Sequence, residues 1–292
     1  MIRVHKLLDT PSVTLAVFDH PPGDVHHDPE HEVAERHSIS FVERGSFDVR
    51  VRGETWRFSP GTIFVTEREL EFSCTHDSEC PDDRCLSVGY GEQTVQDLLD
   101  AGIPALRPRV EWSAARQSFL RHRLGSCEPG DELRLELIAG ALFQSLAAGG
   151  ASRPMRDALR VTDVMRRIDR AVELIETSFA RQLTLRELAD AAGMSVYHFA
   201  RVFREMTGLP AHRYLTAVRL RHAARRLDEG DSVTHTCYAV GFASLSHFVT
   251  AFRKRFGIAP SAAAKGARYP LLHASLASPI WHAAKDGKNA QA

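Results

Sequence analysis

The chain of 292 residues is 43% hydrophobic and 25% charged, which is typical of folded globular proteins, and at roughly 100–200 residues per domain its length predicts about two domains. No run approaches the ~18 apolar residues of a membrane-spanning helix, and the N-terminus lacks the apolar core of a signal peptide, so we expect a cytoplasmic protein without a membrane partner. The formal net charge is zero, but residues 181–268 hold 14 Lys and Arg against 6 Asp and Glu, while the rest of the chain holds 23 against 31. This asymmetry favours a polyanionic partner for the basic C-terminal part.

Residues 1–110 are predicted to be rich in β-strands. The stretch "SISFVERGSFDVRVRGETWRFSPGTIFVT" (38–66) alternates apolar and polar residues in short runs, and Gly45, Gly53 and Pro60-Gly61 interrupt those runs. This pattern is typical of a small antiparallel sandwich or barrel whose alternate apolar residues face the interior.

A cluster of potential metal ligands lies near the end of this β-rich part. The four residues Cys74, His76, Cys80 and Cys85 fall within twelve positions, and thiol and imidazole groups are ligands suited to Zn²⁺ or Cu⁺. The five cysteines of the chain are an odd, sparse set, so we expect reduced thiols that can also be redox-active. Two interpretations stay open: a metal or thiol sensor, or cysteines without a ligand.

A second set of residues, His31, Glu35 and His37, could imitate the histidines and carboxylate of a cupin metalloenzyme. The chain has no P-loop, no G-x-G-x-x-G opening a helix and no G-x-S-x-G motif. We therefore expect no enzyme, with the cupin metalloenzyme as the alternative.

The hydrophobic period changes after about residue 110. The stretches "RQSFLRHRL" (116–124) and "DELRLELIAGALFQSLAAG" (131–149) have apolar residues near 3.6-residue spacing, which predicts two amphipathic helices. They either join two chains through Leu133, Leu137 and Leu142 or cover the barrel. The Gly, Ser and Pro residues of 149–156 then predict a linker.

Residues 169–267 are predicted to be helical throughout, beginning with a helix over 169–180. Thr184 and Glu187 form a capping-box pattern, which predicts a helix start at Thr184. A further helix is predicted between Ser195 as N-cap and Gly208 as C-cap, followed by a long basic connector over 212–230.

The predicted helix after Ser195 has a second copy 49 positions downstream, after Ser244. In this register Phe199 aligns with Phe248 and Phe203 with Phe252. Each copy follows a short helix and a glycine-containing turn, which is the helix-turn-helix arrangement whose second helix enters the DNA major groove. A connector helix of 17 residues spans roughly 25 Å, close to the ~34 Å at which a duplex presents its major groove again. The repeat therefore predicts a two-headed DNA reader rather than a helical solenoid.

The stretches "ADAAGMSVYHFARVFREMTGLPAHRYLTAVRLRHAARRL" and "YAVGFASLSHFVTAFRKRFGIAP" resemble the DNA-binding domain of the AraC/XylS family of bacterial transcription regulators. The resemblance implies a seven-helix domain with two helix-turn-helix motifs and a linker helix, a cupin-like effector domain before it, and helices that commonly dimerise. The sequence departs from the family pattern at Cys237, where a small or aliphatic residue is usual, and after Pro260, where an aromatic residue and an arginine are missing.

The resemblance also implies which side chains contact DNA. Base-facing positions are Tyr197, Ala200 and Arg201 on the first reading helix, and Leu245, Ser246, His247 and Thr250 on the second. The guanidinium of Arg201 is the main candidate for a base contact, because it can donate two hydrogen bonds to guanine in the major groove. Phosphate contacts, which position the protein without specifying sequence, are expected from Arg204, Arg253, Lys254 and Arg255. For His198 and His247, helix packing or a phosphate contact is the alternative to base contact.

We therefore predict an α+β protein: a cupin-like β-barrel or sandwich with flanking helices, followed by an all-α domain with two helix-turn-helix motifs. The predicted parts are an effector domain (1–110), a dimerisation and linker region (111–160), the DNA-binding domain (168–268) and a loosely ordered tail (269–292). Expected partners are double-stranded DNA, an unknown small-molecule or metal effector, a second copy of the chain and RNA polymerase. The predicted function is sequence-specific transcription regulation, including activation, without a cofactor beyond a metal ion. The alternative is a metal-sensing or redox-sensing protein.

Overall fold

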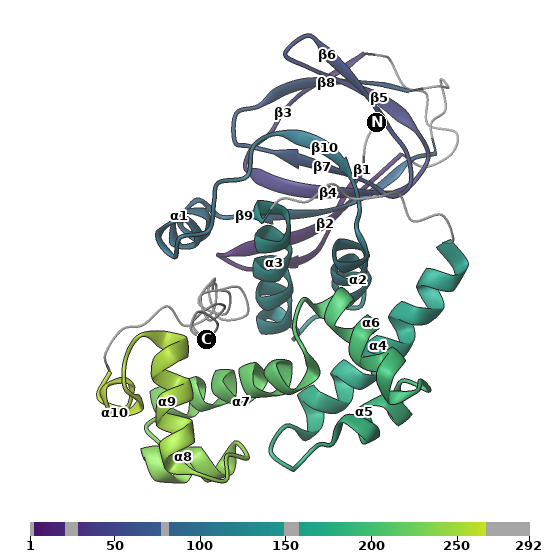
Figure 1. Cartoon of the computed structure of the whole chain (residues 1–292). Coiled ribbons are helices and arrows are strands. Elements are labelled where there is room, and N and C mark those ends of the chain that lie inside the picture. The colour runs from purple at the N-terminus through teal and green to yellow at the C-terminus, as the bar shows by residue number, and fades with distance from the viewer. Residues whose placement is uncertain (1–2, 21–28, 77–81, 149–157, 267–292) are drawn as a thin grey trace, which may run out of the picture. The chain divides into compact units, whose positions relative to one another are not determined.

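The computed structural model describes residues 3–20, 29–76, 82–148 and 158–266, except for the side chains of Glu30, Leu133 and residues 158–161 (Figure 1). The chain divides into two compact units. The N-terminal unit comprises residues 1–100 and 104–158, and the C-terminal unit comprises residues 159–292 together with 101–103.

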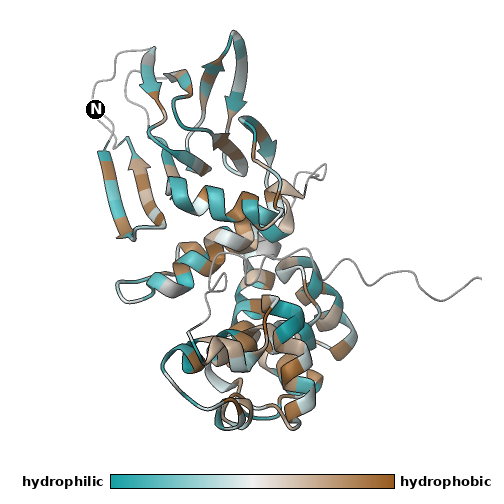
Figure 2. Ribbon diagram, turned by 90° about the vertical axis from the view of Figure 1, so that its left-hand side faces the viewer, coloured by the Kyte–Doolittle hydropathy of each residue, from teal (hydrophilic) through white to brown (hydrophobic). Residues whose placement is uncertain are grey.

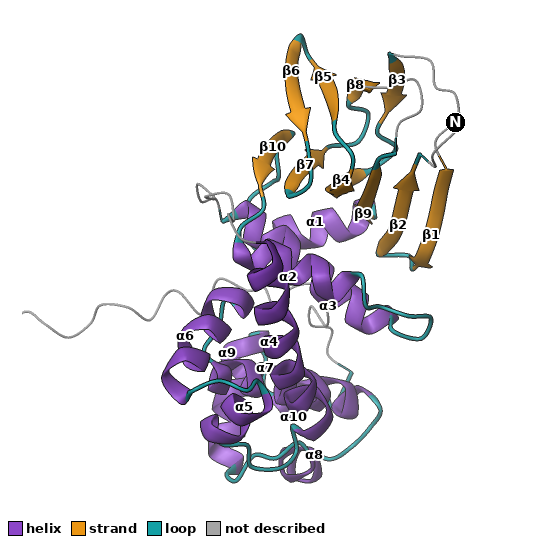
Figure 3. Ribbon diagram, turned by 90° about the vertical axis from the view of Figure 1, so that its right-hand side faces the viewer, coloured by secondary structure: helices purple, strands orange, loops and turns teal. Residues whose placement is uncertain are grey.

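The N-terminal unit contains two antiparallel sheets, which agrees with the predicted sandwich or barrel. One sheet has six strands in the order β1-β2-β9-β4-β7-β10, and the other has four strands in the order β3-β8-β5-β6 (Figure 3). The strands are β1 (Arg3–Asp9), β2 (Val13–Asp19), β3 (Glu30–Val33), β4 (His37–Arg44), β5 (Phe47–Val51), β6 (Glu54–Phe58), β7 (Thr62–Thr66), β8 (Glu71–His76), β9 (Arg84–Tyr90) and β10 (Arg109–Trp112).

Alternation along the strands builds the core between the two sheets. On β5, Phe47, Val49 and Val51 are buried, whereas Asp48 and Arg50 between them are not, and Figure 2 shows such hydrophobic and hydrophilic bands on the strands. The inward side chains of β5 pack with residues of the other sheet, including Val42 and Phe64. The two-residue period of a strand therefore places one face of each sheet in a shared interior.

The structure also contains a helix within the part that was expected to be β-rich. Helix α1 (Glu92–Asp100) follows β9 and buries Thr94, Val95 and Leu98 on one face. The three- and four-residue spacing of these positions is a helical period, but the segment is only nine residues long. Prediction from the alternating strands before it missed this short helix.

Helices α2 (Ala115–Leu124) and α3 (Glu132–Ala147) occur where the period predicted them. They pack on each other, and the hydroxyl of Tyr90 in β9 donates a hydrogen bond of 2.9 Å to the carbonyl of Ala139 in α3. Leu137 and Leu142 are buried in this packing. They fill the interior of their own chain, as expected for helices that cover the sheet, and are not available to a second chain.

The described part of the C-terminal unit contains seven helices and no strand. The helices are α4 (Ala158–Ser178), α5 (Leu185–Ala191), α6 (Val196–Thr207), α7 (Ala211–Asp228), α8 (Val233–Ala239), α9 (Leu245–Phe256) and α10 (Pro260–Ala263). Helix α4 begins eleven residues before the predicted start at Asp169, and Met165 and Ile168 extend its buried face upstream.

The predicted caps are present in the structure. The hydroxyl of Thr184 accepts a hydrogen bond of 3.2 Å from the backbone N–H of Glu187, whose carboxylate accepts one of 2.7 Å from the backbone N–H of Thr184. A hydrogen bond from Arg181 and then those from Thr184 lower the pKa of Glu187 to about 2. Among the described residues, none of the helices combines the length and the apolar composition that crossing a membrane requires.

Candidate nucleic-acid interface and interior cavity

Helices α6 and α9 have the same construction. Each has twelve residues, begins after a serine whose hydroxyl accepts a hydrogen bond from the backbone N–H three positions on, and ends at a glycine in the left-handed conformation. The serines are Ser195 and Ser244, and the glycines are Gly208 and Gly257. Local sequence therefore sets identical limits for both helices.

The turns before these helices differ by one residue. Gly193 and Gly241 occupy the two turns with positive φ, and they are 48 positions apart, whereas the helices that follow are offset by 49. The backbone N–H of Met194 bonds to the carbonyl of Ala189, and that of Phe242 bonds to the carbonyl of Cys237, again at an offset of 48. The second turn thus contains one additional residue, and both turns close with the same hydrogen bond.

One face of each helix is buried in the C-terminal unit. On α6 the buried apolar residues include Phe199, Val202, Phe203 and Met206. On α9 the buried residues are Phe248, Phe252, Arg255 and Phe256, and the three phenylalanines pack into one cluster with Cys237 of α8. Cys237, the departure from the family pattern, therefore fills the core of the second motif.

The opposite faces carry most of the residues that were predicted to contact DNA. On α6, Tyr197 is 84% exposed, Arg201 and Arg204 are exposed, and Ala200 is half-buried. On α9 the exposed candidates are Leu245, Ser246, His247, Thr250, Arg253 and Lys254. A terminal nitrogen of Arg201 lies 3.4 Å from Nδ1 of His198, so these two polar side chains lie together on the surface of α6.

The structure does not support the phosphate contact that was expected from Arg255. It is only 7% exposed, and burial lowers the pKa of its guanidinium to about 10. The repeat supplies the reason, because a shift of 49 positions aligns Arg255 with Met206, which is buried as well. Arg255 therefore occupies a core position of the helix and is not presented on the surface.

The linker helix α7 connects the two motifs and is held at its centre by Arg219. Its guanidinium donates hydrogen bonds of 2.8 Å to the carbonyl of Phe179 and 2.9 Å to that of Arg181, both between α4 and α5. The same guanidinium lies 6.0 Å from the ring centroid of Phe242 in the second motif. Arg219 thus contacts one segment that precedes the linker helix in the chain and one that follows it. Sequence reasoning did not assign this role to Arg219.

A cavity of about 500 Å³ lies in the N-terminal unit, with walls from both sheets. The six-stranded sheet contributes hydroxyl groups on four of its strands, and the four-stranded sheet contributes mainly apolar side chains such as Phe47, Val49 and Phe72. The hydroxyl residues are Thr14, Ser38, Ser40, Thr66 and Ser87.

The residues of the cupin-like set are only partly brought together. His31 and Glu35 line the cavity, whereas His37 begins β4 opposite Tyr90 and is not part of the lining. Within the described ranges, the three do not form a group of converging metal ligands.

The predicted Cys and His ligands are also only partly brought together. Cys74, His76 and Cys85 all line the cavity, and Cys80 lies outside the described residues. Burial and the neighbouring Asp83 raise the pKa of the Cys85 thiol well above its usual value. In the part of the chain that the structure describes, His76 converges with His20 and Asp83 instead of with the two cysteines. Sequence reasoning missed His20 and Asp83, which are 63 positions apart.

A C-terminal unit with two capped helix-turn-helix motifs, together with an N-terminal β-sandwich that holds a cavity, defines a regulator of the double helix-turn-helix class. Residues 188–266 match the family described as a helix-turn-helix domain. The chain is 30% identical over 251 residues to the transcriptional activator RhaS of Citrobacter koseri, covering 80% of this chain and 86% of that protein.

Two solved structures are also similar. The fatty-acid-bound ToxT of Vibrio cholerae is 14% identical, with a TM-score of 0.37, covering 91% of this chain and 97% of that one. The DNA-binding domain of AdpA in complex with a target DNA is 29% identical, with a TM-score of 0.33, covering 34% of this chain and 90% of that one. On the extent of the match to RhaS, the chain belongs to the AraC family of helix-turn-helix transcription regulators, and it is a DNA-binding regulator rather than an enzyme.

Proposed function

We propose that α6 and α9 of a single chain enter two successive major-groove segments on one face of a DNA duplex. The observation that carries this proposal is the repetition of one helix, with the same caps and an exposed polar face, before and after the linker α7. Helix α7 has 18 residues, and at 1.5 Å per residue it is about 27 Å long. This length suits the ~34 Å repeat of the major groove.

The exposed side chains of the two helices have different roles in this proposal. Base-edge contacts come from Tyr197, Ala200 and Arg201 on α6, and from Leu245, Ser246, His247 and Thr250 on α9. Phosphate contacts come from Arg204, Arg253 and Lys254, whose exposed charges position the helices without reading sequence. His198 supports Arg201 from the same surface, where their nitrogens are 3.4 Å apart.

Replacement of Arg201 tests the assignment of base contacts. Arg201→Ala removes a bidentate donor to guanine and is expected to weaken binding to a selected specific site by about 1–3 kcal/mol. Gel-shift titration should measure this loss, and selection from random DNA should show relaxed preference at one base pair. Arg225→Ala is the matched control, because Arg225 is also exposed but lies on the linker helix. Unchanged affinity and unchanged base preference in Arg201→Ala would refute the assignment.

The N-terminal unit is proposed to hold the effector domain within residues 1–110, with its effector bound in the cavity between the sheets. The cavity volume of about 500 Å³ is in the usual range of ~300–1,000 Å³ for small-molecule sites. Its hydroxyl-bearing wall and its apolar wall together suit a ligand that has both polar and apolar groups. Bound effector would favour the DNA-competent arrangement of the chain only by binding it more tightly than other arrangements.

The remaining partners follow from the family and from the named relative. RhaS is an activator, so we propose that this chain also activates transcription, in the cytoplasm, through contact with RNA polymerase. We propose a homodimer joined through residues 111–160. Since Leu137 and Leu142 are buried within one chain, other side chains of this region would form the contact.

A further inference from the structure

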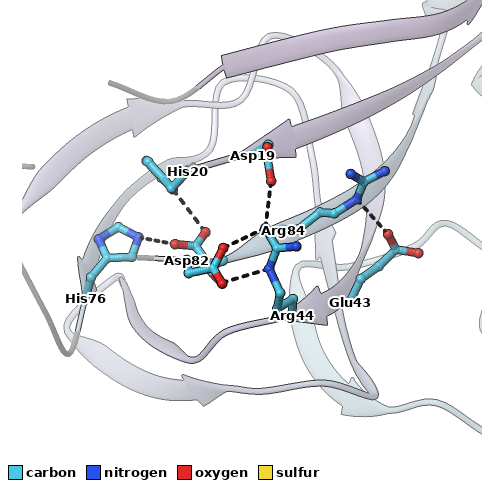
Figure 4. Close-up of polar contacts among 8 residues, drawn as sticks. Asp19, His20, Glu43, Arg44, His76, Asp82 and Arg84 are labelled. Atoms are coloured by element: carbon cyan, nitrogen blue, oxygen red, sulfur yellow. Dashed lines mark hydrogen bonds and ion pairs between the residues drawn. The ribbon is translucent and has the colours of Figure 1, made fainter. Parts of the chain in front are cut away.

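Three titratable side chains meet in the wall of the interior cavity. His20 directly follows β2, His76 is the last residue of β8, and Asp83 directly precedes β9. Their side chains are 4%, 2% and 8% exposed. In Figure 4 the dashed lines from the two labelled imidazoles end on one carboxylate, which is that of Asp83 and carries no label. We refer to these three residues as the His-Asp-His cluster.

The fold holds the cluster by regular strand pairing. Strands β2 and β9 are neighbours, with Asp19 opposite Arg84, and a backbone hydrogen bond of 2.9 Å from His20 to Asp83 extends this pairing by one step. His76 comes from the second sheet, where it pairs with Phe47 in β5. The cluster therefore joins both sheets at the ends of three strands.

The distances within the cluster suit a small metal ion. Nδ1 of His20 lies 3.0 Å from Oδ2 of Asp83, and Nε2 of His76 lies 3.5 Å from Oδ1. One ligand atom from each residue lies within 4.8 Å of the others. A tetrahedral Zn²⁺ site with bonds of about 2.0–2.1 Å has ligand atoms about 3.3–3.4 Å apart.

The carboxylate of Asp83 supplies an independent observation. Its Oδ1 is buried and accepts no hydrogen bond from the described residues, since His76 at 3.5 Å makes only a long contact. A buried carboxylate oxygen without a donor is costly, and a cation at this point would compensate it. The alternative is that the cluster only ties the two sheets together, through the contact between His76 of the four-stranded sheet and Asp83 next to β9 of the six-stranded sheet.

We propose that His20, His76 and Asp83 bind one divalent transition-metal ion of the zinc class in the cavity wall. Two imidazoles and one carboxylate favour such an ion over Mg²⁺ or Ca²⁺, which prefer oxygen ligands alone. All three residues line the cavity, so the ion has an open position towards it for water or an effector atom. The site belongs to the N-terminal unit and the DNA-reading helices belong to the C-terminal unit, so the test of the site requires no DNA.

Metal titration of the full-length, chelator-treated protein under reducing conditions tests this site. Zn²⁺ is titrated against a chromophoric chelator, and Co²⁺ serves as a spectroscopic probe of the ligands. The wild-type protein should bind one equivalent of Zn²⁺, whereas His76→Gln and Asp83→Asn should bind it at least ~100-fold more weakly. Loss of a residue that only hydrogen-bonds to a metal ligand usually weakens binding by about 10–100-fold. His31→Gln is the matched control, because His31 lines the same cavity outside the cluster and should bind as the wild type does.

Measurements on the wild-type protein alone can also overturn the proposal, so it does not depend on how well the variants fold. The absence of one-to-one Zn²⁺ binding would leave only the structural tie between the sheets. An intense thiolate-to-Co²⁺ charge-transfer band would assign the ligands to cysteines instead. Wild-type affinity in both Asp83→Asn and His76→Gln would contradict the ligand set.

Discussion

Two arginines on α9, Arg253 and Arg255, have opposite surroundings although they are two positions apart. Arg253 is exposed, so its charge can reach a phosphate, whereas Arg255 is only 7% exposed and is one of the buried residues of α9. Successive helical residues differ by about 100° in direction, so a displacement of two positions moves a side chain to the other side of the helix. Only one of the two charges is therefore available to DNA.

The salt dependence of DNA binding distinguishes these two arginines. Arg253→Ala should reduce the slope of log affinity against log salt by about 1, because one phosphate contact is lost. Arg255→Met introduces the residue type found at the aligned position of α6, Met206, and should leave the slope unchanged. Circular dichroism of each variant checks that the helices remain folded. An equal reduction of the slope in folded Arg255→Met would mean that Arg255 reaches the DNA.

The burial of Arg255 could be read from the sequence, but the His-Asp-His cluster could not. Arg255 lies three residues after Phe252 and aligns with Met206, so its place on the apolar face is a local property. His20 and Asp83 are separated by 63 positions and meet only because β2 and β9 are neighbours in the sheet. No local pattern specifies that pairing, and the clustering of Cys74, Cys80 and Cys85 in the sequence drew attention away from His20 and Asp83.

Among the elements, the turn of the second helix-turn-helix motif is closely packed against the segment between α4 and α5. Gly241 has a φ of +86°, and a Cβ atom at this position would overlap the carbonyl oxygen of Ala180 and lie 2.8 Å from its carbonyl carbon. Gly257, at the end of α9, has a φ of +75° and open space around it. A substitution at Gly257 therefore introduces backbone strain alone, whereas one at Gly241 introduces backbone strain and steric overlap.

Alanine at these glycines should destabilise the protein to different extents. Gly257→Ala is expected to cost about 1–2 kcal/mol, which is the usual penalty of a left-handed conformation. Gly241→Ala should cost a further ~1–3 kcal/mol, because Ala180 must move to admit the methyl group. Urea unfolding followed by circular dichroism measures both, since the C-terminal unit is helical. Equal destabilisation by the two substitutions would show that the approach of Ala180 is not a constraint.

Helix limits were the most predictable features of the fold. Thr184, Ser195 and Gly208 act through hydrogen bonds to residues a few positions away, so sequence alone predicted the caps that the structure contains. Helix α1 was missed because its nine residues are too few to show a clear helical period after the alternating strands. The early start of α4 was missed because its first residues follow closely on the Gly, Ser and Pro residues that predicted a linker. The order of strands in the two sheets depends on long-range pairing and did not follow from the alternation of residues.

At the scale of the whole molecule, the basic excess of residues 181–268 coincides with the unit that contains both reading helices. The remaining, acidic part of the chain contains the sandwich and its cavity. Charge, fold and family membership therefore agree on a basic DNA-binding part, and the cavity lies in the other, acidic part of the chain. In the proposed mode of binding, α6 and α9 of one protomer contact two groove segments, so a second chain is not required.

A hydroxyl-radical footprint of the full-length protein on its selected site tests this central claim most directly, with the number of chains per complex measured by native mass spectrometry. We predict two protected segments per polypeptide, on one face of the duplex and about 10 base pairs apart, which is one turn of B-DNA. A single protected segment per polypeptide, or two segments on opposite faces of the duplex, would contradict the account.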